Sequence, residues 1–232
     1  STSRQLTDCA RKMNKALPTI FGLMVAFATA SGYAQEVKGD AAAGAQKNAM
    51  CIGCHNIVGY KSSFPEVYKV PMISGQNAAY IDAALQEYKK GARKFPTMRS
   101  IADSLTDQDM ANLAAYYAAD GKKIEVAEKP AKAPDEVVSL LLQKGGCVSC
   151  HGENFSKPIN DAYPKIAGQH ADYLYVTLKA YKNPKEGPYS GRANPIMGGI
   201  AAQFTNQELR QLANYIGALD SQLQVVPESR FR

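Results

Sequence analysis

A five-residue pattern that occurs twice limits how this chain can fold. Residues 51–55 read CIGCH and residues 147–151 read CVSCH. C-x-x-C-H is the attachment motif of c-type haem, in which both cysteines form thioethers with the porphyrin and the histidine binds its iron. We therefore predict two covalently bound haem c groups. The predicted thioether residues are Cys51, Cys54, Cys147 and Cys150, and the predicted histidine ligands are His55 and His151.

Other uses of paired cysteines explain the pattern less well. Cysteine pairs that share a structural zinc usually lie about 15–20 residues apart, whereas the second motif begins 96 residues after the first. A thioredoxin-like redox pair would lie in an alternating strand and helix pattern, which the sequence lacks. Disulfides would not require a histidine after both motifs.

Further similarities accompany the two motifs and indicate an internal duplication. Residues 71–76 (PMISGQ) match 164–169 (PKIAGQ), and residues 105–117 (LTDQDMANLAAYY) match 204–216 (FTNQELRQLANYI). Between them, three residues recur with constant spacing: Tyr80, Leu85 and Tyr88 match Tyr173, Leu178 and Tyr181. We predict an N-terminal domain at residues 35–120, an exposed linker at 121–134 and a C-terminal domain at 135–232.

The periodicity of apolar residues predicts an all-α fold. In each half we expect a helix that leads into the cysteine motif, from residue 40 to 51 and from 135 to 144. A second helix is expected at 77–90 and at 170–182. The last helix of each half follows a capping box, Thr106 with Asp109 and Thr205 with Glu208. No segment alternates convincingly as a strand.

The N-terminal segment predicts export. Residues 13–15 (MNK) open a short basic stretch, residues 17–30 (LPTIFGLMVAFATA) are apolar, and small residues occur within 31–34 (SGYA). This is the pattern of a secretory signal peptide. We predict that residues 1–34, an upstream extension plus a cleavable signal, are removed with Cys9, and that the mature protein is periplasmic. The alternative is an uncleaved anchor helix, although the apolar run is shorter than the roughly 20 residues of a membrane span.

The net charge gives no support for nucleic-acid binding. The whole chain carries +6, but loss of residues 1–34 leaves 23 basic and 20 acidic residues, a net charge of +3. Haem propionates would bring the total close to neutral. No basic helix or interleaved aromatic pattern indicates a nucleic-acid surface either.

Two methionines are the best candidates for the remaining iron ligands. Met98 and Met197 occupy matching places, each two residues after a proline, Pro96 or Pro195. We expect these prolines to stiffen an extended loop that presents the thioether. His170 is disfavoured because its counterpart is Asn77. Three other methionines are disfavoured as iron ligands. Met50 adjoins Cys51 and cannot easily reach the opposite face of the haem, Met72 matches a lysine in the second half, and Met110 is expected in the core.

These residues resemble the cytochrome c4 family of dihaem class I cytochromes c. The resemblance covers residues 39–220 and rests on the tandem C-x-x-C-H motifs, the repeated G-Q-x-A-x-Y segments (75–80 and 168–173), the P-x-M segments and the L-A-x-Y helices. It implies two tandem cytochrome c domains related by a pseudo-twofold axis, each around one covalent haem. It also implies a periplasmic carrier, soluble or loosely membrane-associated. One departure is Asn56, where such proteins often have glycine, as at Gly152.

The expected function is electron transfer between a quinol-oxidising complex and a terminal oxidase, without catalytic residues. The alternative is the electron-accepting cytochrome subunit of a periplasmic dehydrogenase that oxidises sulfide or an alcohol. A dihaem enzyme, such as a peroxidase or a thiosulfate-oxidising cytochrome, is disfavoured. It would need an iron with an open or unusual ligand position, whereas histidine and methionine together fill both axial positions.

Overall fold

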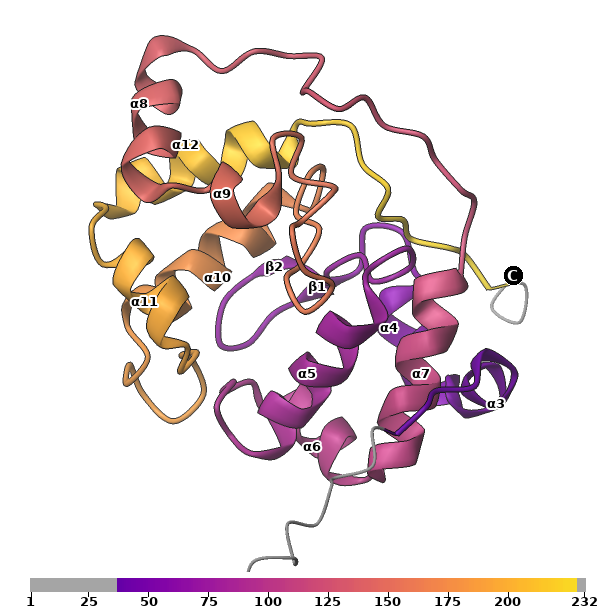
Figure 1. The fold of residues 1–232 in the computed structure, drawn as a ribbon. Helices are drawn as coiled ribbons and strands as arrows, with labels where there is room; N and C mark the ends of the chain where they lie inside the picture. Colours follow the sequence, from indigo (N-terminus) through magenta and orange to yellow (C-terminus); the bar gives the residue numbers. More distant parts are fainter. Residues whose placement is uncertain (1–36, 229–232) are drawn as a thin grey trace, which may run out of the picture. The chain divides into compact units, whose positions relative to one another are not determined.

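The computed structural model describes residues 37–228 of the chain, and residues from Val37 onward belong to one compact unit. The predicted signal peptide and Cys9 lie outside the described residues. The described part is mostly helical, as the periodicity predicts (Figure 1). Within it, no helix is long and apolar enough to cross a membrane.

The two halves contain corresponding helices in the same order. The N-terminal half has α3 (Ala41–Lys47), α4 (Ala49–His55), α5 (Ala78–Lys89), α6 (Pro96–Asp103) and α7 (Asp107–Ala119). The C-terminal half has α8 (Glu136–Gly145), α9 (Val148–His151), α10 (Ala171–Lys182), α11 (Pro195–Ala201) and α12 (Asn206–Gly217). The predicted capping boxes are present at the starts of α7 and α12.

Two local predictions about secondary structure are wrong. The helix expected from residue 40 to 51 is divided at Asn48, whose carbonyl accepts from both Cys51 N (2.8 Å) and Ile52 N (3.1 Å) and so starts a new helix. A short hairpin also forms, in which β1 (Lys61–Ser62) pairs antiparallel with β2 (Tyr68–Lys69). Strands of two residues are too short for an alternating pattern to reveal them.

Each half has its own hydrophobic core. In the N-terminal half, α5 and α7 pack together, and Met110 and Tyr117 of α7 are fully buried. This confirms the prediction that Met110 is a core residue. In the C-terminal half, α10 and α12 pack in the same way around Leu209 and Leu212. Helix α3 lies close against α7 because Gly44 has no side chain: a Cβ there would be 2.2 Å from the carbonyl oxygen of Asn112.

Two irregular segments run between the halves. Residues 120–135 contain no helix or strand, as expected of a linker, and the boundaries of the two domains stay a prediction. Residues 219–228, which we call the C-terminal strap, return to the N-terminal half. Gln224 N donates to Ser74 O (3.0 Å), and Asn56 Nδ2 donates to Val226 O (2.6 Å). The strap also follows the linker, because the amide of Gln224 bonds both the N–H and the C=O of Lys122 (Figure 1).

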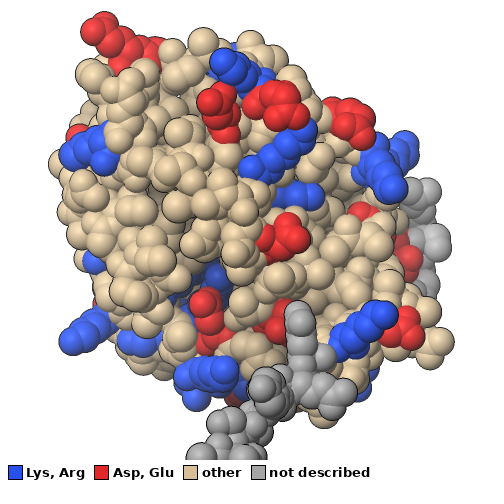
Figure 2. Space-filling view, viewed as in Figure 1, with Lys and Arg blue, Asp and Glu red and all other residues tan. Residues whose placement is uncertain are grey.

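Charged side chains of both signs are interspersed on the face shown in Figure 2, which also has a broad uncharged area. No large patch of one sign is visible on this face.

Candidate haem site

A single cavity of about 610 Å³ brings the predicted site residues together. Its walls come from both halves, chiefly from α4, α5, α6 and α7 and from α9, α10, α11 and α12. All eight residues predicted from the sequence line it: Cys51, Cys54, His55, Met98, Cys147, Cys150, His151 and Met197. The cavity is lined mainly by apolar side chains, as a site for a large flat porphyrin should be.

The four motif cysteines lie at the cavity wall and form no disulfide with one another. Cys51 and Cys54 lie one turn apart on α4, so their side chains share a face of the helix. Cys147 precedes α9 and Cys150 lies within it. Burial raises the pKa of Cys51 to about 11 and also raises that of Cys147, so both are neutral thiols at pH 7. The arrangement suits covalent attachment to a hydrophobic cofactor in both halves.

Both motif histidines are oriented by the same contact. His55 Nδ1 lies 2.9 Å from Pro71 O, and His151 Nδ1 lies 3.1 Å from Pro164 O. A carbonyl oxygen can only accept, so Nδ1 carries the hydrogen and Nε2 keeps its lone pair for a metal. Burial lowers the pKa of both imidazoles, which keeps them neutral. The chemistry of this donor set fits an iron ligand in each half.

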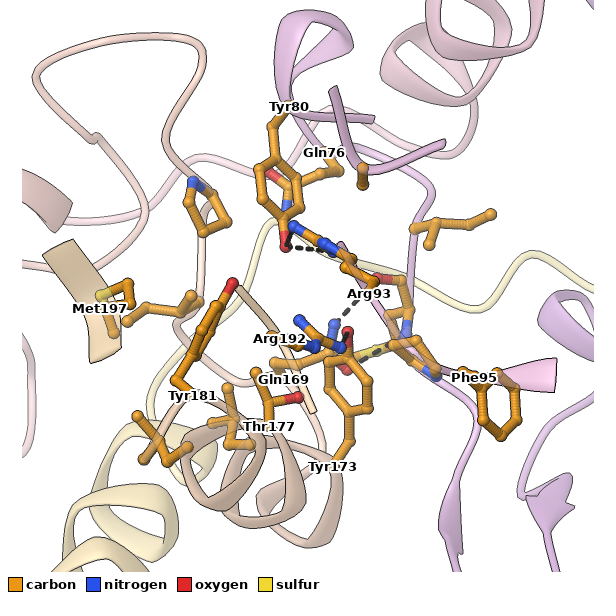
Figure 3. A pocket seen from close by; sticks show the side chains of 18 of the residues that line it. Gln76, Tyr80, Arg93, Phe95, Gln169, Tyr173, Thr177, Tyr181, Arg192 and Met197 are labelled. Atoms are coloured by element: carbon orange, nitrogen blue, oxygen red, sulfur yellow. Dashed lines mark hydrogen bonds between the residues drawn. The ribbon is translucent and has the colours of Figure 1, made fainter. Parts of the chain in front are cut away.

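The two predicted methionines lie on helices and not in extended loops. Pro96 and Pro195 are the first residues of α6 and α11, so Met98 and Met197 lie in the first helical turn. Proline suits this position because its fixed φ matches the helix and its missing N–H would have no partner there. The expectation of an extended loop was therefore wrong. In Figure 3 Met197 lies at the wall of the cavity near Tyr181.

The competing ligand candidates occupy different places. Met110 is buried in the core and does not line the cavity. Met50 and Met72 do line the cavity, but Met50 is 48% exposed and the backbone of Met72 is held by the side chain of Gln169. His170 immediately precedes α10 as its N-cap residue and is absent from the cavity wall.

A reciprocal contact between the halves was not predicted from the sequence. The Gln76 side chain bonds the backbone N–H and C=O of Lys165, each at 2.9 Å. The Gln169 side chain makes the same pair of bonds to Met72, at 3.1 and 2.9 Å. Gln76 matches Gln169 and Met72 matches Lys165 in the duplication, so the contact has approximate twofold symmetry. The recurrence of Gly-Gln in both halves was the available sequence signal, but it did not indicate a partner.

A buried group of arginines and tyrosines was also missed. Arg93 and Arg192 pair across an isolated bridge, and each guanidinium lies over two tyrosine rings (Figure 3). Both arginines line the cavity, and burial raises the pKa of the nearby Tyr80 to about 12. Arginine is usually exposed, so its type alone gave no reason to place it inside.

Comparisons with known proteins agree with this geometry. The cytochrome c family model matches residues 138–220. Cytochrome c4 of Azotobacter vinelandii is 32% identical over 225 residues, which cover 89% of this chain and all of that protein. A thiosulfate dehydrogenase electron acceptor of Stutzerimonas stutzeri is 30% identical and covers 74% of this chain and 80% of its own. The crystal structure of reduced cytochrome c4 from Pseudomonas stutzeri is 27% identical, with a TM-score of 0.56 over 78% of this chain and all of that one.

The duplicated helices, the two cysteine motifs and these similarities lead to one description. The protein consists of two tandem cytochrome c domains and carries two covalently bound haem c groups. It is an electron-transfer cytochrome that exchanges electrons with redox protein partners. The chain belongs to the cytochrome c4 family.

Proposed function

We propose that the protein is a periplasmic dihaem electron carrier with histidine and methionine as the axial ligands of both irons. His55 and Met98 serve the N-terminal haem, and His151 and Met197 serve the C-terminal one. The observation that supports this most directly is that both methionines line the same cavity as the motif residues, at equivalent positions of α6 and α11. The thioethers are formed by Cys51, Cys54, Cys147 and Cys150.

This ligand set suits electron transfer better than catalysis. When bound, haem supplies a one-electron couple. The thioether of methionine is a soft ligand and raises the reduction potential. Histidine and methionine together leave no axial position for oxygen, peroxide or a substrate. The buried imidazoles are held by backbone carbonyls, so the ligand geometry is fixed before the electron arrives.

We propose a quinol-oxidising complex as the donor and a terminal oxidase as the acceptor. The predicted signal peptide supports a periplasmic location for this exchange. An exposed apolar side chain lies at each cysteine motif: Met50 precedes Cys51, and Val148 lies between Cys147 and Cys150. Such uncharged positions beside a haem edge suit the small, transient interfaces of redox encounters. Loose association with the membrane would bring the carrier close to both complexes.

A second candidate is the electron-accepting subunit of a periplasmic dehydrogenase. The similarity to a thiosulfate dehydrogenase electron acceptor favours it and adds thiosulfate to the substrates to be considered. The carrier and the dehydrogenase subunit can be distinguished by how each meets its redox partner. A carrier should accept electrons from quinol-oxidising membranes at a rate that depends on its concentration, whereas a subunit should copurify in a fixed ratio with one catalytic chain.

An absorption spectrum from the visible to the near infrared tests the ligand assignment. The oxidised protein should show a methionine–iron charge-transfer band sized for two haems, and carbon monoxide should leave the reduced spectrum unchanged. A band of half that size, or a carbon monoxide shift in one haem, would contradict the carrier proposal and point to an open iron.

A further inference from the structure

The cavity wall beside Cys51 contains a buried hydroxyl that the second half lacks. Tyr117 of α7 is 1% exposed, lines the cavity and belongs to the core against which Cys51 packs. The duplication matches Tyr117 with Ile216, which lines the cavity in the second half with a purely apolar side chain. A buried hydroxyl is not screened by water, so its dipole acts on nearby charges more strongly than that of an exposed one.

A chain of hydrogen bonds fixes the direction of this hydroxyl. Asn56 is 4% exposed, and its Nδ2 donates to Val226 O of the C-terminal strap at 2.6 Å. A carbonyl oxygen can only accept, so the amide of Asn56 must face the strap with its nitrogen. Its Oδ1 is thereby turned toward Tyr117, whose hydroxyl donates to it at 3.4 Å. The hydrogen of the Tyr117 hydroxyl therefore points toward Asn56.

The oxygen of the same hydroxyl lies within hydrogen-bonding reach of the Cys51 sulfur. Burial raises the pKa of Tyr117 well above its ordinary value, so the hydroxyl stays neutral. Because its hydrogen is used by Asn56, the hydroxyl presents its lone pairs, the negative end of its dipole, to the sulfur. A thioether sulfur has no hydrogen to donate and accepts more weakly than an amide oxygen, so this orientation persists when Cys51 carries haem.

The second half does not provide the same chain. Asn56 matches Gly152, where φ is +79° and a Cβ would be 2.1 Å from Lys157 O. An asparagine therefore does not fit there unless the loop moves. Since Ile216 replaces the tyrosine as well, both side chains of the chain are confined to the first half.

We propose that Tyr117, oriented by Asn56, lowers the reduction potential of the haem attached at Cys51. Oxidation makes a haem more positive, so the negative end of a dipole beside the attachment atom favours the oxidised state. The matched wall position beside Cys147 is Ile216, which has no such dipole. The two haems thus differ in their surroundings although the attachment motifs are equivalent. This rests on the thioether at Cys51, which is part of the proposed function, and not on the identity of the axial ligands.

Potentiometric titration of the purified dihaem protein tests the proposal with Tyr117→Phe, which removes only the hydroxyl. One midpoint potential should rise by about threefold in the ferrous-to-ferric ratio, which equals about 28 mV for a one-electron couple at about 59 mV per tenfold change. Asn56→Gly introduces the residue of the second half and lets the hydroxyl turn its hydrogen to the sulfur, so it should raise the same potential. In the double variant, Asn56→Gly should add nothing, because the hydroxyl through which it acts is gone.

The haem that responds can be identified from its absorption. Cys54→Ala removes the other thioether of the first haem and leaves a vinyl group conjugated with the porphyrin, which moves the α band of that haem to longer wavelength. Addition of Tyr117→Phe to this variant should raise the potential that titrates at the shifted band. In a Cys150→Ala background the shifted band belongs to the second haem, and Tyr117→Phe should leave its potential unchanged.

Tyr215→Phe is the matched control. Tyr215 is a buried tyrosine of α12 whose hydroxyl donates to Lys132 O at 3.1 Å, and it does not line the cavity. Its replacement removes one hydroxyl from the last helix of the other half and should shift neither potential appreciably. If Tyr117→Phe lowers a potential, or shifts both no more than Tyr215→Phe does, the proposal is wrong. An effect of Tyr117→Phe without one of Asn56→Gly would overturn the orienting role of Asn56.

This proposal and the assignment of the axial ligands can fail separately. A haem count of two in each variant with all four motif cysteines shows that covalent attachment is intact. A half-sized near-infrared band in the wild type would overturn the ligand assignment and leave the role of Tyr117 standing. Unchanged potentials in Tyr117→Phe, with a band sized for two haems, would overturn the role of Tyr117 alone.

Discussion

Met98 and Met110 lie close together in the sequence but serve different purposes. Met110 is fully buried in the N-terminal core, where its counterpart is Leu209, and no special property of sulfur is needed there. Met98 lies in the first turn of α6 at the cavity wall. The two side chains are of the same type, so only the position at the cavity wall distinguishes the proposed ligand from the core residue.

Replacement of a ligand methionine should open an iron. We expect Met98→Ala or Met197→Ala to remove half of the near-infrared charge-transfer band and to let one haem per molecule bind carbon monoxide after reduction. The physical reason is that alanine leaves one axial position without a donor. Titration of the reduced variant with carbon monoxide measures the stoichiometry.

The control for this experiment is Met110→Leu, a nearly volume-conserving change in the core. It should leave the band and the lack of carbon monoxide binding unchanged. Binding of carbon monoxide by Met110→Leu but not by Met98→Ala would mean that the ligand was assigned to the wrong methionine.

The site residues divide into those that the sequence predicts and those that it does not. Cysteine and histidine could be predicted because covalent haem attachment requires these types at a fixed spacing. Met98 and Met197 could be singled out because the duplication puts them at equivalent positions, and both line the cavity, whereas their role as iron ligands stays a prediction. The burial of Arg93 and Arg192 could not be predicted, since it depends on tyrosine rings that surround them only after folding.

At the scale of the helices, the capping boxes were predictable because each uses only four consecutive residues. In α12, Thr205 Oγ1 accepts from Glu208 N, and Glu208 Oε2 accepts from Thr205 N at 2.6 Å. This hydrogen bond to the backbone amide of Thr205 lowers the pKa of Glu208. The same arrangement lowers the pKa of Asp109 in α7.

The lowered pKa predicts a pH-dependent contribution to stability. A carboxyl whose pKa is lower in the folded state stabilises the protein above its unfolded pKa, and this is lost as the pH falls through the folded pKa. The difference in unfolding free energy between wild type and Glu208→Gln should therefore be present at pH 7, begin to decrease near the unfolded pKa of glutamate, about 4.3, and vanish only below the lowered folded pKa. Urea unfolding at several pH values measures it.

The exposed linker carboxylate of Glu125 offers the control. The difference between wild type and Glu125→Gln should be small at every pH. A difference for Glu208→Gln that is the same at acidic and neutral pH would show that the ionised carboxylate does not support the cap.

The hairpin is the element that the sequence did not predict, and it joins the two halves. Tyr68 of β2 is buried, with its ring centroid 5.9 Å from Tyr173 and 6.2 Å from Phe95. Nearby, Lys69 N donates to Asp172 Oδ2, and Lys179 Nζ pairs with Glu66 at 2.6 Å. The hairpin and the residues beside it thus contact α10, a distant partner that no local pattern could indicate.

Removal of this aromatic contact should destabilise the protein. Tyr68→Ala leaves a gap between Phe95 and Tyr173, and we expect a loss of about 3 kcal/mol in unfolding free energy. Denaturant unfolding followed by circular dichroism measures it. Tyr189→Ala removes a ring contact with Phe64 from an exposed position, so its loss should be well below that. Equal losses would mean that burial of Tyr68 is not what stabilises the hairpin.

At the scale of the whole described unit, the halves are joined by two kinds of contact. The reciprocal bonds of Gln76 and Gln169 are symmetric, as a duplicated interface requires. The C-terminal strap is asymmetric. It follows the second half of the duplication and contacts the first half, whereas the segment that follows the first half is the linker. The duplication allowed the corresponding helices of the two halves to be predicted. The path of the strap could not be predicted, because no repeated pattern indicates it.

The strap should contribute to stability through Gln224. Its side chain bonds both backbone groups of Lys122, and its N–H donates to Ser74 O. Gln224→Ala should lower the unfolding free energy by about 1–2 kcal/mol, since it leaves the linker backbone unpaired, and should accelerate proteolysis within residues 121–134. Gln203→Ala, an exposed glutamine with one long hydrogen bond, should change neither. Unchanged cleavage in Gln224→Ala would show that the linker does not depend on the strap.

The route of the strap also bears on how the protein is made. Asn56 lies next to the first C-x-x-C-H motif, yet its side-chain partner, Val226, is 170 residues further along the chain. A chain synthesised from its N-terminus exposes the first motif long before the segment that closes over its neighbour exists. The first attachment reaction thus has an interval in which its thiols are accessible, and the strap, which emerges later, completes the half that was started first.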